Sequence, residues 1–394
     1  MRKDLKAYLA ATLLHRAQPL IESFILTLTL SIEEFGQWSW ASALYLGVAS
    51  IAHGGIPAAM LRYSAMHVAE GSPLLGYGLK WMLPWAASGS LILLLLSFSV
   101  PSPVRQLVWA HLPALPAFLV AEVVRTYLRG RYENAQLLRW QILSTSFALI
   151  LLALTSAMWG VCGAAYMRLL QPLWLLLPTF HLLKEAYASS SHQHFPGFLR
   201  FGGHSLWGNW ALEGIFFLPA WLIGWQSESP LSLAYWRWAT LLPLNIRAIF
   251  SQIVIYFYPT WVRSALAPHL LYHKQRLLLW GTATAIAIGL LLLSLGWRIF
   301  PGEAYLPALP YYWGAIGIGL WWSTEPLLLP NLLSAKGNIK GYSTAYAVGL
   351  LTAIPFYVLA RENLWLHLVG MGTAGITASL LSNHMMRHLR DTNP

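Results

Sequence analysis

Four arginines lie within long apolar stretches of this 394-residue chain: Arg16, Arg168, Arg237 and Arg247. A guanidinium surrounded by lipid costs at least about 2.5–3.5 kcal/mol, so each of these side chains must face a partner or a polar cavity. The guanidinium stays charged and can bind two oxygens of a phosphate or a carboxylate at once. Arginines in these places could therefore hold an anionic group, or pair with acidic neighbours as structural contacts.

Four glutamates occur in the same kind of surroundings: Glu22, Glu122, Glu213 and Glu325. A carboxyl group isolated from water can exchange a proton near neutral pH, which suits an ion carrier. Arg125 follows Glu122 by one helical turn, which favours a local ion pair at that position. We therefore predict Glu22, Glu213 and Glu325 as candidates for ion coupling, with simple pairing to a buried arginine as the alternative.

Other catalytic or metal-binding signals are weak. The single cysteine, Cys162, excludes disulfides within the chain and cysteine-based metal clusters. His192 and His194 could bind a metal, but a solvated loop is the simpler interpretation of their serine-rich surroundings. We find no nucleophile elbow, P-loop or HExxH motif. The sequence therefore predicts no catalytic residue, no metal site and no cofactor, and a protein that is not an enzyme.

The composition indicates which elements hold these residues. Hydrophobic residues make up 57% of the chain and charged residues only 10%, whereas soluble domains carry about 25% charged residues. A membrane-spanning helix needs roughly 20 mostly apolar residues. We expect an all-α, polytopic membrane protein with about twelve transmembrane helices, approximately at 7–31, 37–60, 80–100, 106–128, 141–158, 160–183, 199–224, 232–259, 275–296, 307–332, 341–359 and 363–384.

The basic residues predict the orientation of these spans. If the N-terminus is cytoplasmic, only Arg105, Arg298 and Arg361 fall in loops on the opposite side. Positively charged loops stay in the cytoplasm, so both termini are predicted to be cytoplasmic. The net charge of +11 is then explained by loop charge, and we expect no nucleic-acid partner.

An internal repeat divides the chain in two. The tetrapeptide at 38–41 (Trp-Ser-Trp-Ala) recurs as Trp-Arg-Trp-Ala at 236–239, and each copy opens the second span of a six-span block. Six spans between the copies imply parallel repeats, related by a pseudo-two-fold axis along the membrane normal. We therefore predict two six-helix lobes, 1–190 and 191–394, in the arrangement of transporters that rock two lobes around a central cavity.

Three short segments carry a family resemblance. They are Phe35-Gly36-Gln37-Trp38-Ser39-Trp40, His53-Gly54-Gly55-Ile56-Pro57-Ala58-Ala59-Met60-Leu61-Arg62-Tyr63 and Trp159-Gly160-Val161-Cys162-Gly163-Ala164-Ala165. They resemble the second span, and the turn between spans five and six, of the Wzx-like polysaccharide flippases. Those proteins form one branch of the multidrug/oligosaccharidyl-lipid/polysaccharide (MOP) exporter superfamily.

The resemblance implies a transport function and a cellular location. The substrate would be an oligosaccharide on a polyprenyl diphosphate, moved by alternating access to the external leaflet of a bacterial inner (cytoplasmic) membrane. A proton or sodium gradient would drive this antiporter, and membrane lipids and a glycan polymerase or ligase would be its partners. Only Asp4 and Asp391 are aspartates, so the intramembrane aspartate of some ion-coupled members is not matched.

The resemblance also suggests substrate-binding residues. Related flippases place cavity arginines in spans one, two and eight, which match Arg16, Arg62 and Arg247 here. Arg16 lies roughly 13 Å into the first span at 1.5 Å per residue, and Arg247 is also near mid-membrane. We add Arg237 as a fourth candidate.

Two alternative functions stay open. A multidrug exporter of the same superfamily would present acidic and apolar walls to cationic drugs. A membrane-embedded glycan polymerase or ligase would need a long external loop with catalytic residues, and the predicted external loops are short.

Overall fold

The computed structural model describes residues 2–67, 71–189, 195–227, 229–264 and 268–392, and every regular element within them is helical. The chain divides into two compact units, residues 1–206 and 207–394. The division falls inside helix α9 (Phe198–Gln226), later in the chain than the lobe boundary that we predict after residue 190.

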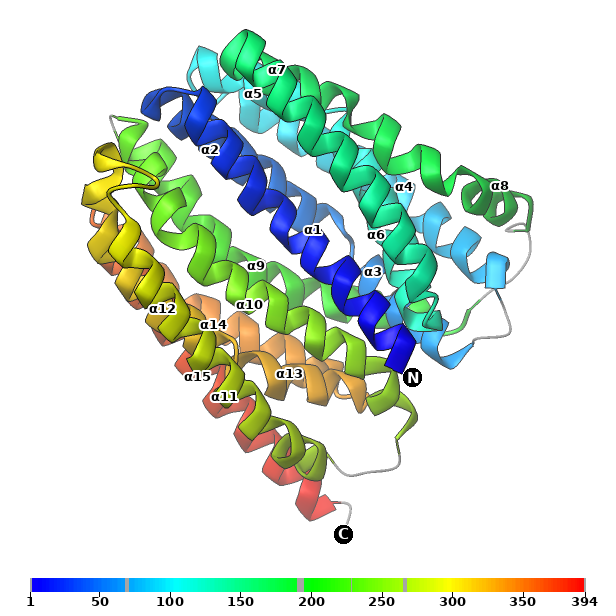
Figure 1. Ribbon diagram of the computed structural model, residues 1–394. Helices are drawn as coiled ribbons and strands as arrows, with labels where there is room; N and C mark the ends of the chain where they lie inside the picture. The colour runs from blue at the N-terminus through cyan, green and yellow to red at the C-terminus, as the bar shows by residue number, and fades with distance from the viewer. Residues whose placement is uncertain (1, 68–70, 190–194, 228, 265–267, 393–394) are drawn as a thin grey trace. The chain divides into compact units, whose positions relative to one another are not determined.

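The first unit contains the helices of the first six predicted spans (Figure 1). They are α1 (Arg2–Thr29), α2 (Ile32–Ala52), α3 (Ile56–Met66), α4 (Gly71–Ser97), α5 (Ser102–His111), α6 (Ala114–Arg131) and α7 (Asn134–Leu176), followed by η2 (Leu177–Thr179) and α8 (Phe180–Ser189). Helix α1 packs against α7, and α6 packs against α3, α4 and α7.

Helix α7 contains two predicted spans joined by a tight turn. Trp159 and Gly160 have non-helical backbone angles, and Gly160 has φ +56°. A Cβ on Gly163 would lie 1.9 Å from the carbonyl oxygen of Thr155, so the chain folds back closely on itself here. The structure thus places the turn between spans five and six where the 159–165 segment predicts it.

The second predicted span is broken. We expect one continuous helix over 37–60, and this is wrong, because α2 ends at Ala52 and α3 begins at Ile56 with a bend of 50°. Gly54 (φ +57°) and Gly55 (φ +70°) adopt the left-handed conformation that only glycine adopts at low cost. A Cβ on Gly55 would lie 1.8 Å from the carbonyl oxygen of Gly202. The glycine pair therefore lets the bend contact the first turns of α9 directly.

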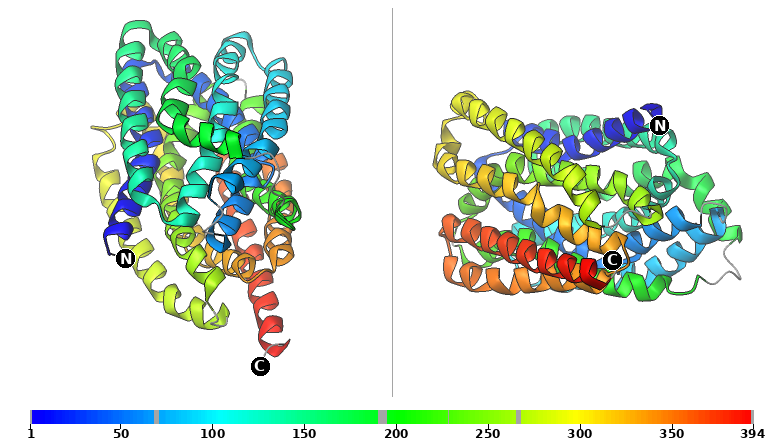
Figure 2. Two further views of the ribbon diagram at one scale, coloured as in Figure 1. Left: turned by 90° about the vertical axis from the view of Figure 1, so that its right-hand side faces the viewer. Right: turned by 90° about the horizontal axis from the view of Figure 1, so that it is seen from below.

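The second unit contains the helices of the last six predicted spans. After α9 come α10 (Leu231–Arg263), α11 (Pro268–Leu293), η3 (Ser294–Gly296), η4 (Glu303–Ala308), α12 (Leu309–Trp322), α13 (Glu325–Ala335), α14 (Ile339–Ala360) and α15 (Leu364–Thr392). Helices α14 and α15 pack along each other (Figures 1 and 2), and α10 packs against α12 and α13.

Tyrosine hydroxyls of α14 replace the backbone hydrogen bonds that prolines remove from two of these helices. Pro219 in α9 and Pro330 in α13 have no N–H to donate to the carbonyl four residues earlier, and an unsatisfied carbonyl is costly inside a membrane. Those carbonyls belong to Ile215 and Pro326. The hydroxyl of Tyr357 donates to the first at 2.7 Å, and that of Tyr346 donates to the second at 2.9 Å.

The two units repeat one local feature. The fourth span of each is a pair of short helices, α5 with α6 in the first unit and α12 with α13 in the second. Trp38 and Trp236, the first residues of the repeated tetrapeptide, are both buried, and each packs against a histidine ring, at 5.3 and 5.6 Å. These correspondences agree with the sequence repeat.

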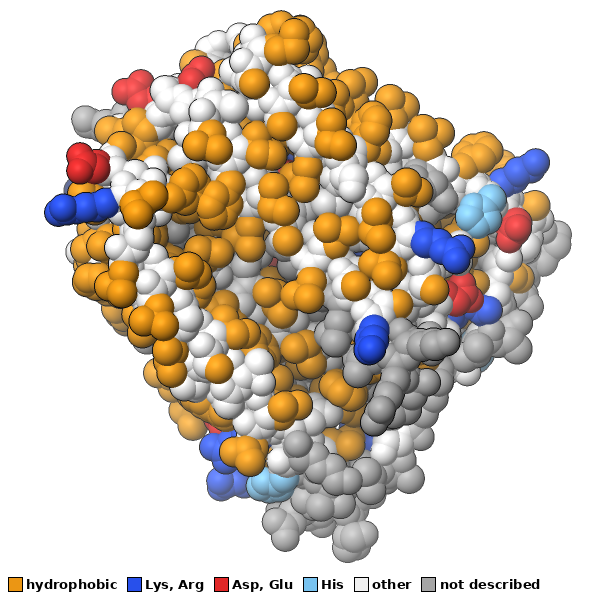
Figure 3. Space-filling model, in the orientation of Figure 1, with side chains coloured by type: hydrophobic (Ala, Val, Ile, Leu, Met, Phe, Trp, Pro, Cys, Tyr) orange, Lys and Arg blue, Asp and Glu red, His pale blue; other side chains and the backbone are white. Residues whose placement is uncertain are grey.

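The helices are suited to a bilayer. Among the described residues six helices are long and apolar enough to cross a membrane, and the bent pairs α2–α3 and α5–α6 pass the same test as pairs. Helix α1, helix α9 and the α12–α13 pair also correspond to predicted spans but fall outside this set. Figure 3 shows hydrophobic side chains over the middle of the face it presents, as expected for a lipid-facing surface.

Candidate functional site

The best-defined polar contact of the first unit is an ion pair between α1 and α7. The Arg168 guanidinium lies 2.9 Å from the Glu22 carboxylate, and their side chains are only 12% and 8% exposed. The packing of α1 against α7 brings together two residues that are 146 positions apart. Glu22 is thus neutralised by Arg168, which is the pairing with a buried arginine that the sequence leaves open as the alternative to ion coupling.

Four neutral side chains extend this pair into a network. Gln18 donates to Glu22 at 2.8 Å, and Arg168 donates to Gln171 at 3.1 Å. Thr145 donates to Gln18 at 3.1 Å, and Gln141 donates to Thr145 at 2.8 Å. Spacings of four residues on α1 and α7 place these groups on facing helix sides. We call these six residues, 18, 22, 141, 145, 168 and 171, the Glu22–Arg168 network.

Aromatic rings and a histidine border this network. The Arg168 guanidinium lies 5.5 Å from the centre of the Trp38 ring, and the same ring packs against His111. His111 is fully buried, and its Nδ1 lies 2.7 Å from the carbonyl oxygen of Leu107, whereas Nε2 has no hydrogen-bond partner among the described residues. Our sequence reasoning missed His111, although an isolated histidine in an apolar stretch was a visible signal.

The second unit places a different set of charges around Arg247. This residue lies near the middle of α10, with its guanidinium carbon 3.8 Å from the centre of the Phe216 ring on α9. The Nε atom is buried, and no N–H of this guanidinium reaches an acceptor or a carboxylate within the described part of the chain. An aromatic face stabilises a cation by about 0.5–2 kcal/mol but accepts no conventional hydrogen bond. The donors of Arg247 therefore remain available to a bound group.

Glu213 lies one turn before Phe216 on the same helix. Glu213 and Arg247 both lie within electrostatic range of the hydroxyls of Tyr342 and Tyr346 on α14. Over the described residues, the half-buried Glu213 carboxylate has no hydrogen bond and no ion pair. We call residues 213, 216, 247, 342 and 346 the Arg247 cluster. Asn209 holds the Tyr342 side chain of this cluster by accepting a hydrogen bond of 2.6 Å from its hydroxyl.

The remaining predicted arginines are Arg16, Arg62 and Arg237. Arg62 is half-buried on α3, with its guanidinium 5.0 Å from the Phe201 ring, and Arg237 is half-buried on α10. Arg16 lies on α1, but its side chain is outside the described part of the structure. The structure thus places Arg16 and Arg62 in the first unit and Arg237 and Arg247 in the second.

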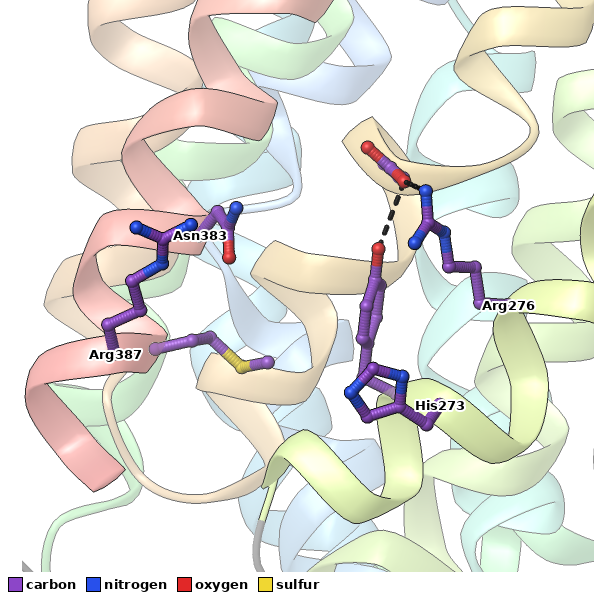
Figure 4. Close-up of a pocket in the computed structure, with 7 residues that line it drawn as sticks. His273, Arg276, Asn383 and Arg387 are labelled. Atoms are coloured by element: carbon purple, nitrogen blue, oxygen red, sulfur yellow. Dashed lines mark hydrogen bonds and ion pairs between the residues drawn. The ribbon is translucent and has the colours of Figure 1, made fainter. Parts of the chain in front are cut away.

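The third predicted coupling residue, Glu325, lines a pocket of about 350 Å³. Its carboxylate accepts a hydrogen bond of 3.0 Å from the Tyr272 hydroxyl and forms an ion pair with the Arg276 guanidinium at 2.9 Å. Figure 4 shows His273 and Arg276 on α11 on one side of the pocket, and Asn383 and Arg387 on α15 on the other. The salt-bridge partner of Glu325 is therefore an exposed arginine, and not one of the four arginines predicted to lie within spans.

Two further predictions concern paired groups and metals. Arg125 pairs with Glu122, the ion pair that the sequence favours at that position. Within the described residues no group of three metal-ligating side chains comes together. His192 and His194 lie outside those residues.

No family model matches the sequence, and no curated protein matches it. Several solved structures match its fold. A multidrug resistance MATE family transporter of the MOP superfamily, in an outward-facing conformation, matches with a TM-score of 0.73 and 12% identity over 98% of this chain and 94% of its own. An inward-facing structure described in the same terms gives 0.70 and 14% over 96% of both chains. A MOP superfamily transporter from Pyrococcus furiosus, whose binding pocket is described as having reverse polarity, gives 0.71 and 12% over 98% and 94%.

These matches confirm the predicted fold class. The chain has the all-helical, two-lobe, multi-pass membrane fold of MATE transporters of the MOP superfamily. The likeness concerns the fold, and it does not single out the polysaccharide flippase branch that the sequence resembles.

Proposed function

We propose that this protein is an alternating-access transporter that moves an oligosaccharide linked to a polyprenyl diphosphate from the cytoplasmic to the external leaflet. The observation that supports an anionic substrate is Arg247, a guanidinium near the middle of a spanning helix with no carboxylate partner among the described residues. A charge in that place needs a counterion. A diphosphate supplies several oxygens that the guanidinium can bind in pairs.

The Arg247 cluster also offers contacts for the sugar. Tyrosine and phenylalanine rings present flat apolar faces. The Tyr342 hydroxyl donates to Asn209, and its oxygen can also accept a hydrogen bond from a sugar hydroxyl. The lipid tail would stay in the bilayer, so the protein must carry only the headgroup. We place the protein in a bacterial inner membrane with both termini cytoplasmic, together with a glycan polymerase or ligase that uses its product.

The transport step needs an energy source, and we propose Glu213 as the residue that couples it to a proton or sodium gradient. Glu22 and Glu325 are held by Arg168 and Arg276, whereas the Glu213 carboxylate has no such partner in the described structure. Ion binding there would change the charge beside Arg247. Flipping that continues unchanged after both gradients are collapsed would contradict this assignment.

Flipping of a lipid-linked oligosaccharide in vesicles tests the proposal. The purified chain is reconstituted with the substrate, and the fraction reached by an externally added glycosidase is followed over time. We expect Arg247→Gln to slow flipping by about tenfold or more, since one charge-assisted contact is worth about 1.5–3 kcal/mol. Arg298→Gln removes an exposed arginine of the same unit and is the control. Equal rates for Arg247→Gln and the wild type would overturn the proposal.

A multidrug exporter is the second candidate. Similar solved structures are described as multidrug resistance transporters, and the carboxylate of Glu213 could attract a cationic drug. Ethidium efflux from cells separates the two functions. Efflux that depends on Glu213 and is indifferent to Arg247→Gln would favour drug export. Accumulation of the lipid-linked oligosaccharide on the cytoplasmic face of cells that lack the chain would favour the flippase.

A further inference from the structure

The pocket beside Glu325 has features that neither the fold nor the proposed transport requires. Tyr272, His273, Arg276, Glu325, Asn383, Met386 and Arg387 line it, and we call it the α11–α15 pocket. Its volume is about 350 Å³. It lies at the start of α11 and near the end of α15, the ends that the sequence predicts to be cytoplasmic.

The charges around the pocket are unequal. Arg276, Arg387 and His273 can carry positive charge, and Glu325 is the one carboxylate among the described side chains that line the pocket. Glu325 is already engaged, because it accepts from both Tyr272 and Arg276. Arg387 has no hydrogen bond and no ion pair in the described structure, and its guanidinium lies beside Asn383 on the α15 side of the pocket (Figure 4). The pocket therefore has cationic and amide donors to spare for an anion.

The surroundings of the pocket are apolar. Met386 belongs to a buried cluster with Leu329 and Leu333, against which Tyr272 packs. Directly after Arg276 on α11, Leu277 and Leu278 are 82% and 62% exposed, as expected for side chains in contact with acyl chains. The donors thus lie next to an apolar helix surface, near the first residues of the candidate span Leu271–Gly296.

We propose that the α11–α15 pocket binds the phosphodiester headgroup of an anionic phospholipid of the cytoplasmic leaflet. The phosphate lies between Arg387 and the outer N–H groups of Arg276, and the Asn383 amide donates to it. The acyl chains follow the exposed leucines of α11. Basic pockets between helices on the cytoplasmic side are suited to such headgroups.

Native mass spectrometry of the full chain in detergent tests this binding. Dioleoyl phosphatidylglycerol and dioleoyl phosphatidylcholine are titrated into the wild type, Arg387→Gln and the control Arg200→Gln. Arg200 is an exposed arginine outside the pocket, on the side that the sequence predicts to be cytoplasmic. We expect the wild type to prefer phosphatidylglycerol, and Arg387→Gln to weaken its binding about tenfold by loss of one charge-assisted contact. Arg200→Gln should bind as the wild type does.

Three results would overturn the proposal. One is equal binding of the two lipids by the wild type. Another is an equal loss in Arg387→Gln and Arg200→Gln, which would indicate bulk charge alone. The third is displacement of phosphatidylglycerol by millimolar glycerol 3-phosphate, which would indicate a soluble phosphate ligand. Arg387 is exposed and has no partner in the described structure, so its replacement should leave folding unchanged. This test is independent of the flipping assay, which depends on Arg247.

Discussion

Replacement of Arg168 by glutamine measures how far the first unit depends on the ion pair inside the Glu22–Arg168 network. The substitution leaves the Glu22 carboxylate 8% exposed, with Gln18 as its remaining hydrogen-bond donor. Removing one partner of a buried pair costs about 3–5 kcal/mol, because the other charge stays buried and uncompensated. The contact with Trp38 is lost as well, so we expect a loss of about 3–5 kcal/mol at neutral pH.

The reverse substitution and the double variant isolate the pair. Glu22→Gln leaves a buried guanidinium and should cost a similar amount. The double variant Glu22→Gln/Arg168→Gln buries no charge, and we expect it to recover most of the loss, since groups in direct contact are not additive. Arg139→Gln, which changes an exposed arginine of the same helix, should alter stability by less than about 0.5 kcal/mol.

The proteins are unfolded in detergent by increasing dodecyl sulfate, and unfolding is followed by tryptophan fluorescence. This gives the free energies of unfolding of the wild type, the two single variants and the double variant, and that of the Arg139→Gln control. If the double variant loses as much as the two single variants added together, the two charges do not stabilise each other and our description of the network is wrong. If Glu22→Gln alone is as stable as the wild type, the carboxylate is not what holds Arg168.

Two further substitutions test the packing of each unit by the same unfolding measurement. Gly55→Ala should destabilise the protein by about 2 kcal/mol or more, because its Cβ would meet the carbonyl oxygen of Gly202 at 1.8 Å and its φ is +70°. Gly203→Ala is the matched control, since nothing lies within 4 Å of its added carbon, and a similar loss there would refute the steric explanation. Tyr357→Phe should cost about 1–3 kcal/mol by leaving the Ile215 carbonyl unsatisfied, and an unchanged stability would show that this carbonyl has another partner.

The sequence predicts the helical framework well because apolar length is a local property. The twelve apolar stretches each correspond to a helix, a bent pair of helices or one half of α7, and the turn at Trp159 and Gly160 lies where the sequence predicts it. The break at Gly54 and Gly55 was not predictable in the same way. Its residues are small and apolar enough to continue a span, and it depends on the close approach of Gly202, which is distant in sequence.

The candidate sites were predicted less completely, for the same physical reason. Residue type and depth identify Glu22, Glu213 and Glu325 as carboxylates that need an explanation, but only the packing of α1 on α7 reveals that Arg168 neutralises the first. Arg276 neutralises Glu325 in the same way. The isolation of Glu213 is likewise a property of its neighbours, and no sequence spacing encodes it.

The tyrosines of α14 have a consequence for motion. Tyr357 and Tyr346 supply the hydrogen bonds that Pro219 and Pro330 remove from α9 and α13. If α14 slid by one turn against α9 or α13, the carbonyl of Ile215 or Pro326 would lose its tyrosine donor. The hydrocarbon core of the membrane contains no water that could replace this donor. Sliding is therefore resisted at two points, about three helical turns apart on one face of α14. Helices α9, α13 and α14 should consequently travel as one rigid body, and any hinge within this unit has to lie elsewhere.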